Sequence, residues 1–168
     1  MSIELTKVRQ PEEIDAVRML VWEFFDFLRI RYPEMLDTIE AYLVDQDVAG
    51  ELENFDQYFL PPHGECFLAR HRGEPAGIVM MKPHGEHDAE MNRMYVRDNA
   101  RGLGIGRRLG QALIAEARLQ GLGAVWLDAL YRHVEALPLY ESLGFEYYSD
   151  PDAFGGDDKR ILHMKLVL

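Results

Sequence analysis

The sequence predicts a mixed α/β fold with a largely antiparallel central sheet flanked by helices, and three observations support this. The 168 residues, 48% hydrophobic and 28% charged, suit one globular domain over residues 1–168. The hydrophobic period changes from helical spacing before about residue 60 to two-residue spacing afterwards. Glycines then cluster between a strand pattern and a helix pattern, which indicates one parallel crossover.

The first sixty residues predict one strand and two helical regions. Residues 2–8 (SIELTKV) alternate enough for a strand. Pro11 then begins a helix, because proline is tolerated in the first turn, and Pro33 ends it. A second helical region extends from about residue 36 to residue 58, with Gly50 as its expected break.

A meander of three short strands is expected next, at 65–71, 75–82 and 90–97. The stretch 84–88 (HGEHD) falls at a hairpin tip between the last two strands. Its two imidazoles and two carboxylates would bind a metal only with fixed, converging geometry. We therefore expect no metal site there.

The C-terminal half predicts a helix, a strand, a second helix and a final strand pair. Leucines, isoleucine and alanine at helical spacing follow the glycine cluster and mark one apolar face. The expected elements are a helix from 105 to about 121, a strand at 124–129, a short helix at 133–143, and strands at 145–148 and 160–168.

Charge and cysteine content limit the partners and the compartment. The formal charge of −11 argues against nucleic acid as a partner, because phosphate backbones bind basic surfaces. An acidic surface attracts cationic amines, but it also simply keeps a protein soluble, and both interpretations stay open. No apolar run reaches membrane-span length, the first residues lack a signal pattern, and the single Cys66 lies in an apolar stretch. We expect a cytoplasmic protein with no membrane partner and a buried thiol.

The stretch 100–107 (ARGLGIGR) places three glycines where a strand meets a helix. Unpaired amides at a helix N-terminus favour an anion such as phosphate, and bare backbone lets the anion approach. A P-loop would need Lys and a hydroxyl residue after Gly106, where Arg107 and Arg108 stand. A dinucleotide fingerprint begun at Gly104 would place its third glycine on Leu109, so that match is weak.

Two motifs in the right order resemble the GNAT superfamily of acetyl-CoA-dependent N-acetyltransferases. Residues 101–106 (RGLGIG) fit its Arg/Gln-x-x-Gly-x-Gly/Ala signature, and the preceding MNRMYVR resembles its fourth strand. Residues 136–145 (ALPLYESLGF) resemble its A-x-x-L-Y-x-x-L-G-F segment. The order of elements is compatible over nearly the whole chain, so the resemblance implies a single GNAT-like domain.

The resemblance implies acetyl-CoA as co-substrate and a set of residues that bind it. The fourth strand splays from the fifth and pairs with the pantetheine arm, while the glycine loop holds the pyrophosphate. His133 stands where many relatives carry asparagine, which leaves its contact with the cofactor open. The implied cofactor-binding residues are Met94, Tyr95, Val96, Arg101, Gly102, Leu103, Gly104, Ile105, Gly106, Arg107 and His133.

Acetyl transfer to an amine needs a base for the amine and an acid for the departing thiolate. The resemblance implies Tyr140 as the acid, since it occupies the place of the family's tyrosine, and Glu90 as the base. Strand alternation puts Glu90, Asn92, Met94 and Val96 on one face unless a bulge intervenes. Core packing for Tyr140 and simple solvation for Glu90 stay as alternatives.

Together these observations predict an N-acetyltransferase that transfers acetyl from acetyl-CoA to a primary amine of a small molecule by direct attack in a ternary complex. No activated serine or cysteine nucleophile is evident. A protein or peptide N-acetyltransferase and a catalytically silent acyl-CoA-binding module are the alternatives. The expected partner is a small-molecule amine, whose cationic character stays open as above, and the resemblance allows a homodimer.

Overall fold

The computed structural model describes residues 2–131, 133, 135–156 and 158–168. Seven strands form one sheet in the order β1-β2-β3-β4-β5-β7-β6. Neighbouring strands are antiparallel except β4 and β5, which are parallel. The mixed, mostly antiparallel sheet and its single parallel crossover are therefore confirmed. The strands are β1 (Ile3–Lys7), β2 (Glu65–His71), β3 (Glu74–His84), β4 (Asp88–Val96), β5 (Ala124–Leu130), β6 (Glu146–Tyr148) and β7 (Ile161–Val167).

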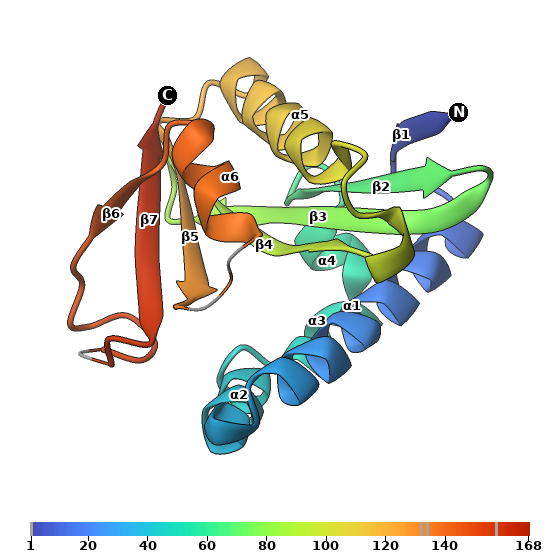
Figure 1. The fold of residues 1–168 in the computed structure, drawn as a ribbon. Helices are drawn as coiled ribbons and strands as arrows, with labels where there is room; N and C mark the ends of the chain where they lie inside the picture. The colour runs from blue at the N-terminus through green and yellow to red at the C-terminus, as the bar shows by residue number, and fades with distance from the viewer. Residues whose placement is uncertain (1, 132, 134, 157) are drawn as a thin grey trace.

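Helices cover both faces of the sheet (Figure 1). One face carries α1 (Pro11–Arg31), α2 (Leu36–Asp45), α3 (Val48–Glu53) and α4 (Phe55–Phe59). The other carries α5 (Ile105–Leu119), which makes the crossover from β4 to β5, and α6 (Ala136–Ser142). Short 3-10 turns occupy Pro33–Met35 and Asp98–Ala100.

Each face of the sheet has its own apolar core. Leu109 and Leu113 of α5 pack with Val125 of β5 in one cluster. Val21 and Phe25 of α1 belong to the other cluster, which also contains the fully buried Cys66. Burial raises the pKa of the Cys66 thiol, which agrees with the expected unreactive, structural role.

The helix break predicted at Gly50 is wrong. Gly50 lies inside α3, and the chain turns instead at Asp47, whose φ of 46° is left-handed. The Asp47 carboxylate accepts a hydrogen bond from the Gly50 amide at 3.3 Å and caps α3. A Cβ on Gly50 would collide with that carboxylate, so a larger residue here would require the Asp47 side chain to move out of its capping position. A second break falls at Asn54, which divides the predicted region into three helices.

The predicted common face of β4 is wrong, because the strand contains a β-bulge. Arg93 has a φ of 51°, and the β3–β4 register shifts between Ile78 and Met80. Met91 and Met94 both pack in the α5-side core, so the two residues between them face the α1 side. Glu90 and Asn92 therefore do not share a face with Met94 and Val96.

The last predicted helix also begins later than expected. After β5, the His133 amide donates a hydrogen bond to the Leu130 carbonyl at 3.1 Å, and α6 starts only at Ala136. The His133 carbonyl accepts hydrogen bonds from the amides of Ala136 and Leu137 at 3.1 and 2.9 Å. His133 thus stands just before the helix that carries Tyr140. Within the described residues, no helix is long and apolar enough to span a membrane.

Candidate active site

The β4 and β5 strands separate soon after they begin. Their parallel pairing is limited to Ala89 with Val125 and Glu90 with Trp126. Beyond Glu90 the main chain of β4 has no pairing with β5 in the described part of the chain. The splay that the resemblance implied is thus present, and it leaves room beside the main chain of Met94, Tyr95 and Val96.

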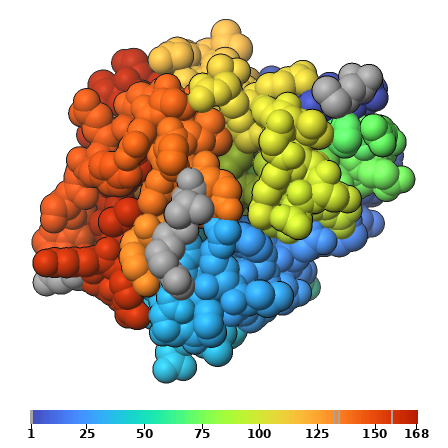
Figure 2. Space-filling model, viewed as in Figure 1, coloured from blue at the N-terminus to red at the C-terminus, as the bar shows by residue number. Residues whose placement is uncertain are grey.

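A groove of about 300 Å³ extends from this splay to the glycine loop. Figure 2 shows it as the hollow between the yellow segment that carries the loop and the orange segment around α6. Every residue that the sequence assigned to the cofactor lines this groove except Leu103, which is partly buried against the α5-side core. We call it the glycine-loop groove.

The loop at the start of α5 fits a bound pyrophosphate. Among the described residues, no main-chain amide from 102 to 107 has a hydrogen-bond partner. Gly102 and Gly104 have φ values of 81° and 80°, and a Cβ on either would point into open space. Free amides at a helix N-terminus bind anions, and side chains at these glycines would intrude on that space.

Two arginines fix this loop in place. Arg101 donates from Nε to the Val96 carbonyl at 3.2 Å, and its guanidinium lies 4.8 Å from the ring centre of Phe27. Arg107 donates to the Ser142 hydroxyl at 2.8 Å, which links α5 to α6. Both guanidinium groups therefore brace the groove while adding positive charge to it.

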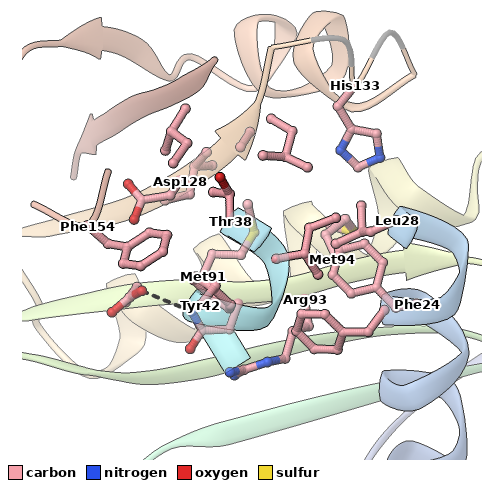
Figure 3. A pocket seen from close by; sticks show the side chains of 18 of the residues that line it. Phe24, Leu28, Thr38, Tyr42, Met91, Arg93, Met94, Asp128, His133 and Phe154 are labelled. Carbon is pink, nitrogen blue, oxygen red and sulfur yellow. Dashed lines mark hydrogen bonds between the residues drawn. The ribbon is translucent and has the colours of Figure 1, made fainter. Parts of the chain in front are cut away.

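A second cavity, of about 100 Å³, lies on the α1 side of the splay. We call it the acceptor cavity. Side chains from α1, α2, β4, β5 and the loop before β7 line it, as Figure 3 shows. Met94 and His133 line both the acceptor cavity and the glycine-loop groove, so the two spaces meet at these residues.

Glu90 lines the acceptor cavity and is held by its neighbours on the strand. Its Oε1 accepts a hydrogen bond from Asn92 Nδ2 at 3.0 Å, and its Oε2 lies 3.9 Å from Nδ1 of His84. The side chain is 21% exposed, so it keeps contact with solvent. A half-buried carboxylate with an oxygen open to the cavity can accept a proton from an amine.

Tyr140 projects from α6 into the wall of the same cavity. It is 5% exposed and packs against Phe145, with ring centres 6.1 Å apart. No described residue makes a hydrogen bond to its hydroxyl. Burial raises the pKa of Tyr140, because an apolar environment disfavours the phenolate. The phenol therefore stays protonated at neutral pH, as a proton donor must.

His133 is neutral at the junction of the two spaces. Burial lowers its pKa to about 4, because desolvation disfavours the charged imidazolium. A neutral imidazole can donate one hydrogen bond and accept another, as the asparagine of related proteins does. The structure therefore places at this position a polar group that carries no charge at neutral pH.

Asp128 is a candidate that sequence reasoning missed. It lines the acceptor cavity from β5, and its Oδ1 lies 2.5 Å from Nδ1 of His163, directly opposite on β7. Burial raises the pKa of Asp128, while the His163 contact opposes that rise. Alternation along β5 could have placed Asp128 on the same face as Trp126, but the pairing of β5 with β7 is not visible in the sequence.

In the described part of the chain, no group of three or more His, Cys, Asp or Glu residues could hold a metal ion. The 84–88 stretch lies at the tip of the β3–β4 hairpin, as predicted: His84 and Asp88 are the last pair of the two strands, and Glu86 and His87 in the turn between them are largely exposed.

The sequence is similar to that of known acetyltransferases. The pattern of the acetyltransferase (GNAT) family matches residues 21–145. An uncharacterised N-acetyltransferase of Schizosaccharomyces pombe is 33% identical over 156 residues, which cover 89% of each chain. The N-acetylaspartate synthetase of Rattus norvegicus is 35% identical over 129 residues, which cover 76% of this chain but only 43% of that protein.

Solved structures show the same fold. The PaiA N-acetyltransferase of Thermoplasma acidophilum, solved in complex with coenzyme A, superposes with a TM-score of 0.72 at 16% identity, covering 100% of both chains. The family match and the named relatives show that the protein is an acyltransferase. The chain belongs to the acetyltransferase (GNAT) family.

Proposed function

We propose that this enzyme transfers the acetyl group of acetyl-CoA to the primary amine of a small molecule, by direct attack in a ternary complex. The observation that carries the proposal is the meeting of two spaces at Met94 and His133. The glycine-loop groove offers free amides for the coenzyme pyrophosphate. The acceptor cavity offers carboxylates for an amine, which arrives as a cation at neutral pH.

Different residues of the two spaces carry out the separate steps of the reaction. Acetyl-CoA supplies an acetyl group on a thioester. Glu90 accepts a proton from the amine, directly or through water, so that the nitrogen has a free lone pair. A carbon–nitrogen bond then forms as the carbon–sulfur bond breaks. Tyr140 donates its phenolic proton to the departing sulfur, the acetylated nitrogen releases its second surplus proton to water, and Tyr140 regains a proton from water, so that the products are the N-acetylated amine and coenzyme A.

A small acceptor is favoured over a protein or peptide by the walls of the cavity. Side chains from α1, α2 and the loop before β7 close around it, among them Phe24, Tyr42 and Phe154. The named relatives also favour this interpretation, since one is a synthetase of N-acetylaspartate. Glu90 and Tyr140 favour an enzyme over a silent acyl-CoA-binding module. The homodimer and the cytoplasmic location stay predictions.

Thiol release from acetyl-CoA tests the proposal directly. The purified protein would be incubated with acetyl-CoA and panels of amino acids, polyamines, aminoglycosides and peptides, and free thiol would be measured against a reaction without acceptor. We expect release with at least one small amine and mass-spectrometric detection of its acetylated form. Release with peptides alone would favour the protein acetyltransferase, and coenzyme binding without release would favour the silent module.

A further inference from the structure

A buried guanidinium with unsatisfied donors lies at the acceptor cavity. The side chain of Arg93 is only 2% exposed, and Arg93 lines the cavity from the bulge of β4. Its Nε and Nη1 have no hydrogen-bond partner among the residues that the structure describes. A buried charged donor without an acceptor is costly, so these two atoms favour a ligand that can accept hydrogen bonds.

The charges around Arg93 leave it incompletely neutralised. Its nearest carboxylate is that of Glu51 on α3, whose Oε1 lies 3.4 Å from Nη2. The other oxygen of Glu51 is 3.0 Å from Nζ of Lys82. One carboxylate thus faces two cations, and the shorter contact belongs to Lys82. The cluster keeps an excess of one positive charge beside the cavity.

The bulge explains why the Arg93 side chain lies on the side of the sheet that carries the acceptor cavity. The left-handed φ of Arg93 turns two successive residues, Asn92 and Arg93, toward the α1 side of the sheet. In the part of the chain that is described, the Oδ1 atom of Asn92 is also buried without a partner. A regular strand would have turned Arg93 toward the α5-side core instead.

The remaining charges of the cavity have the opposite sign. Glu90 and Asp128 line it together with Arg93. In Figure 3, Asp128 lies on the far side of the pocket from Arg93, which is placed near Tyr42. The cavity therefore offers the Asp128 carboxylate and the Arg93 side chain at separate positions, with Glu90 as a second carboxylate in its lining, and this pattern complements a molecule with an ammonium group and a carboxylate.

We propose that the amine acceptor is an amino acid, whose carboxylate binds the free donors of Arg93 while its amine faces Glu90. The inference rests on the proposed acetyl transfer and names its substrate class. Arginine suits this role because its planar fork donates two parallel hydrogen bonds to one carboxylate. The guanidinium is 3.4 Å from Glu51 and 5.9 Å from the ring centre of Phe59, and its Nε and Nη1 keep no partner among the described residues, so these two atoms are the donors left for such a ligand.

Matched pairs of ligands test the carboxylate on the wild-type protein. Each L-amino acid would be compared with its primary carboxamide, which keeps the shape but removes the negative charge. Binding would be measured by calorimetry with coenzyme A present, and turnover by thiol release, both corrected to equal concentrations of free amine. We expect about a 10- to 100-fold preference for the acid over the amide, as for a hydrogen bond to a charged group.

Variants then assign the preference to Arg93. Arg93→Met should abolish the preference for the acid and leave the affinity for the amide unchanged, while Arg93→Lys should retain part of it. Arg18→Met is the matched control, because Arg18 donates to the Leu52 carbonyl of α3 at 2.9 Å but does not line the cavity. It should keep the full preference.

The outcomes separate the two proposals. Thiol release with amines but equal affinity for acid and amide would overturn the amino-acid assignment and leave acetyl transfer standing. Absence of release with every acceptor would contradict acetyl transfer, and calorimetry would still decide the carboxylate. If Arg93→Met failed to fold, the ligand pairs on the wild-type protein would decide, since binding of no amino acid also overturns the inference.

Discussion

Arg31 and Glu135 join the end of α1 to the segment before α6 across 104 positions of sequence. Two guanidinium nitrogens donate to the two carboxylate oxygens at 2.5 and 2.6 Å. Glu135 also lines the glycine-loop groove. The pair therefore ties a helix of one face to the segment that leads to Tyr140, beside the groove in which the coenzyme is proposed to bind.

This ion pair predicts a stability that depends on pH. Hydrogen bonding to Arg31 lowers the pKa of Glu135 to about 2, below its value in an unfolded chain. The stabilisation is present above about pH 4.3 and is lost as pH falls toward 2. Glu135→Gln should reduce the loss in free energy of unfolding over this pH range by about 0.2–1 kcal/mol. The effect is small because the Glu135 side chain is 43% exposed and solvent screens the pair.

Urea unfolding of the wild type and of Glu135→Gln between pH 2 and pH 6 measures this difference. Glu53→Gln is the control, since Glu53 is exposed and makes no ion pair in the described part of the chain. Parallel stability curves for the wild type and Glu135→Gln would contradict the prediction.

Gly104→Ala should weaken coenzyme binding. The added methyl group would point into the groove where the loop amides are expected to hold the pyrophosphate. Gly73→Ala is a matched control, because Gly73 has the same φ of 80° and equally open surroundings but lies in the β2–β3 turn. Both variants should lose about 1 kcal/mol of stability from backbone strain. Calorimetry with coenzyme A should show a loss of affinity in Gly104→Ala alone. Equal affinity in the two variants would refute the binding of the pyrophosphate by the loop amides.

Tyr140→Phe should lower kcat by about 10²–10⁴, the usual contribution of a positioned acid. The change removes one hydroxyl from a packed ring, so folding and coenzyme affinity should persist. The deficit should stay constant with pH through the neutral range, because the raised pKa of Tyr140 keeps the phenol protonated there. Tyr147→Phe, which removes an exposed hydroxyl bonded to Glu141, is the control. Full activity in Tyr140→Phe would exclude it as the acid.

Glu90→Gln should lower activity most at neutral pH. The amide keeps the shape of the side chain but cannot accept a proton from the amine. As pH rises toward the amine pKa, about 10.4 for a lysine-like group and about 8 for an α-amino group, free amine becomes available without the base. The deficit should therefore shrink in a pH–rate profile, whereas Glu86→Gln, in the exposed hairpin turn, should match the wild type throughout. A deficit independent of pH would indicate positioning of the acceptor instead.

His133→Asn should make the folding stability less sensitive to acid, and the variant should stay active. The pKa of His133 is about 4 in the folded protein and about 6.5 when unfolded, so the unfolded state binds more protons between these values. Folding stability due to this residue is complete above pH 6.5 and falls as pH drops toward 4. Unfolding curves should show a shallower decline in His133→Asn than in the wild type. The exposed His63→Asn is the control, and an unchanged decline in His133→Asn would contradict the buried, neutral imidazole.

Much of the fold could be predicted from local sequence. Two-residue and helical periods located the strands and helices, because side-chain burial on one face repeats with the backbone geometry. The glycines at 102, 104 and 106 indicated the loop before α5, and the motif around Tyr140 indicated α6. The helix break at Asp47 could not be predicted, because it depends on a carboxylate that caps the next helix and excludes a side chain at Gly50.

By itself, therefore, the sequence determined where most strands and helices lie, the single crossover and the glycine loop, which follow from local periodicity or from a motif. Only the tertiary structure decided the acceptor cavity. Arg93 faces it because a bulge shifts the register of β4 against β3. Asp128 is held there because β5 pairs with β7, far along the chain. Such pairings depend on how distant strands align, and a shift of one residue reverses the face on which every later side chain lies.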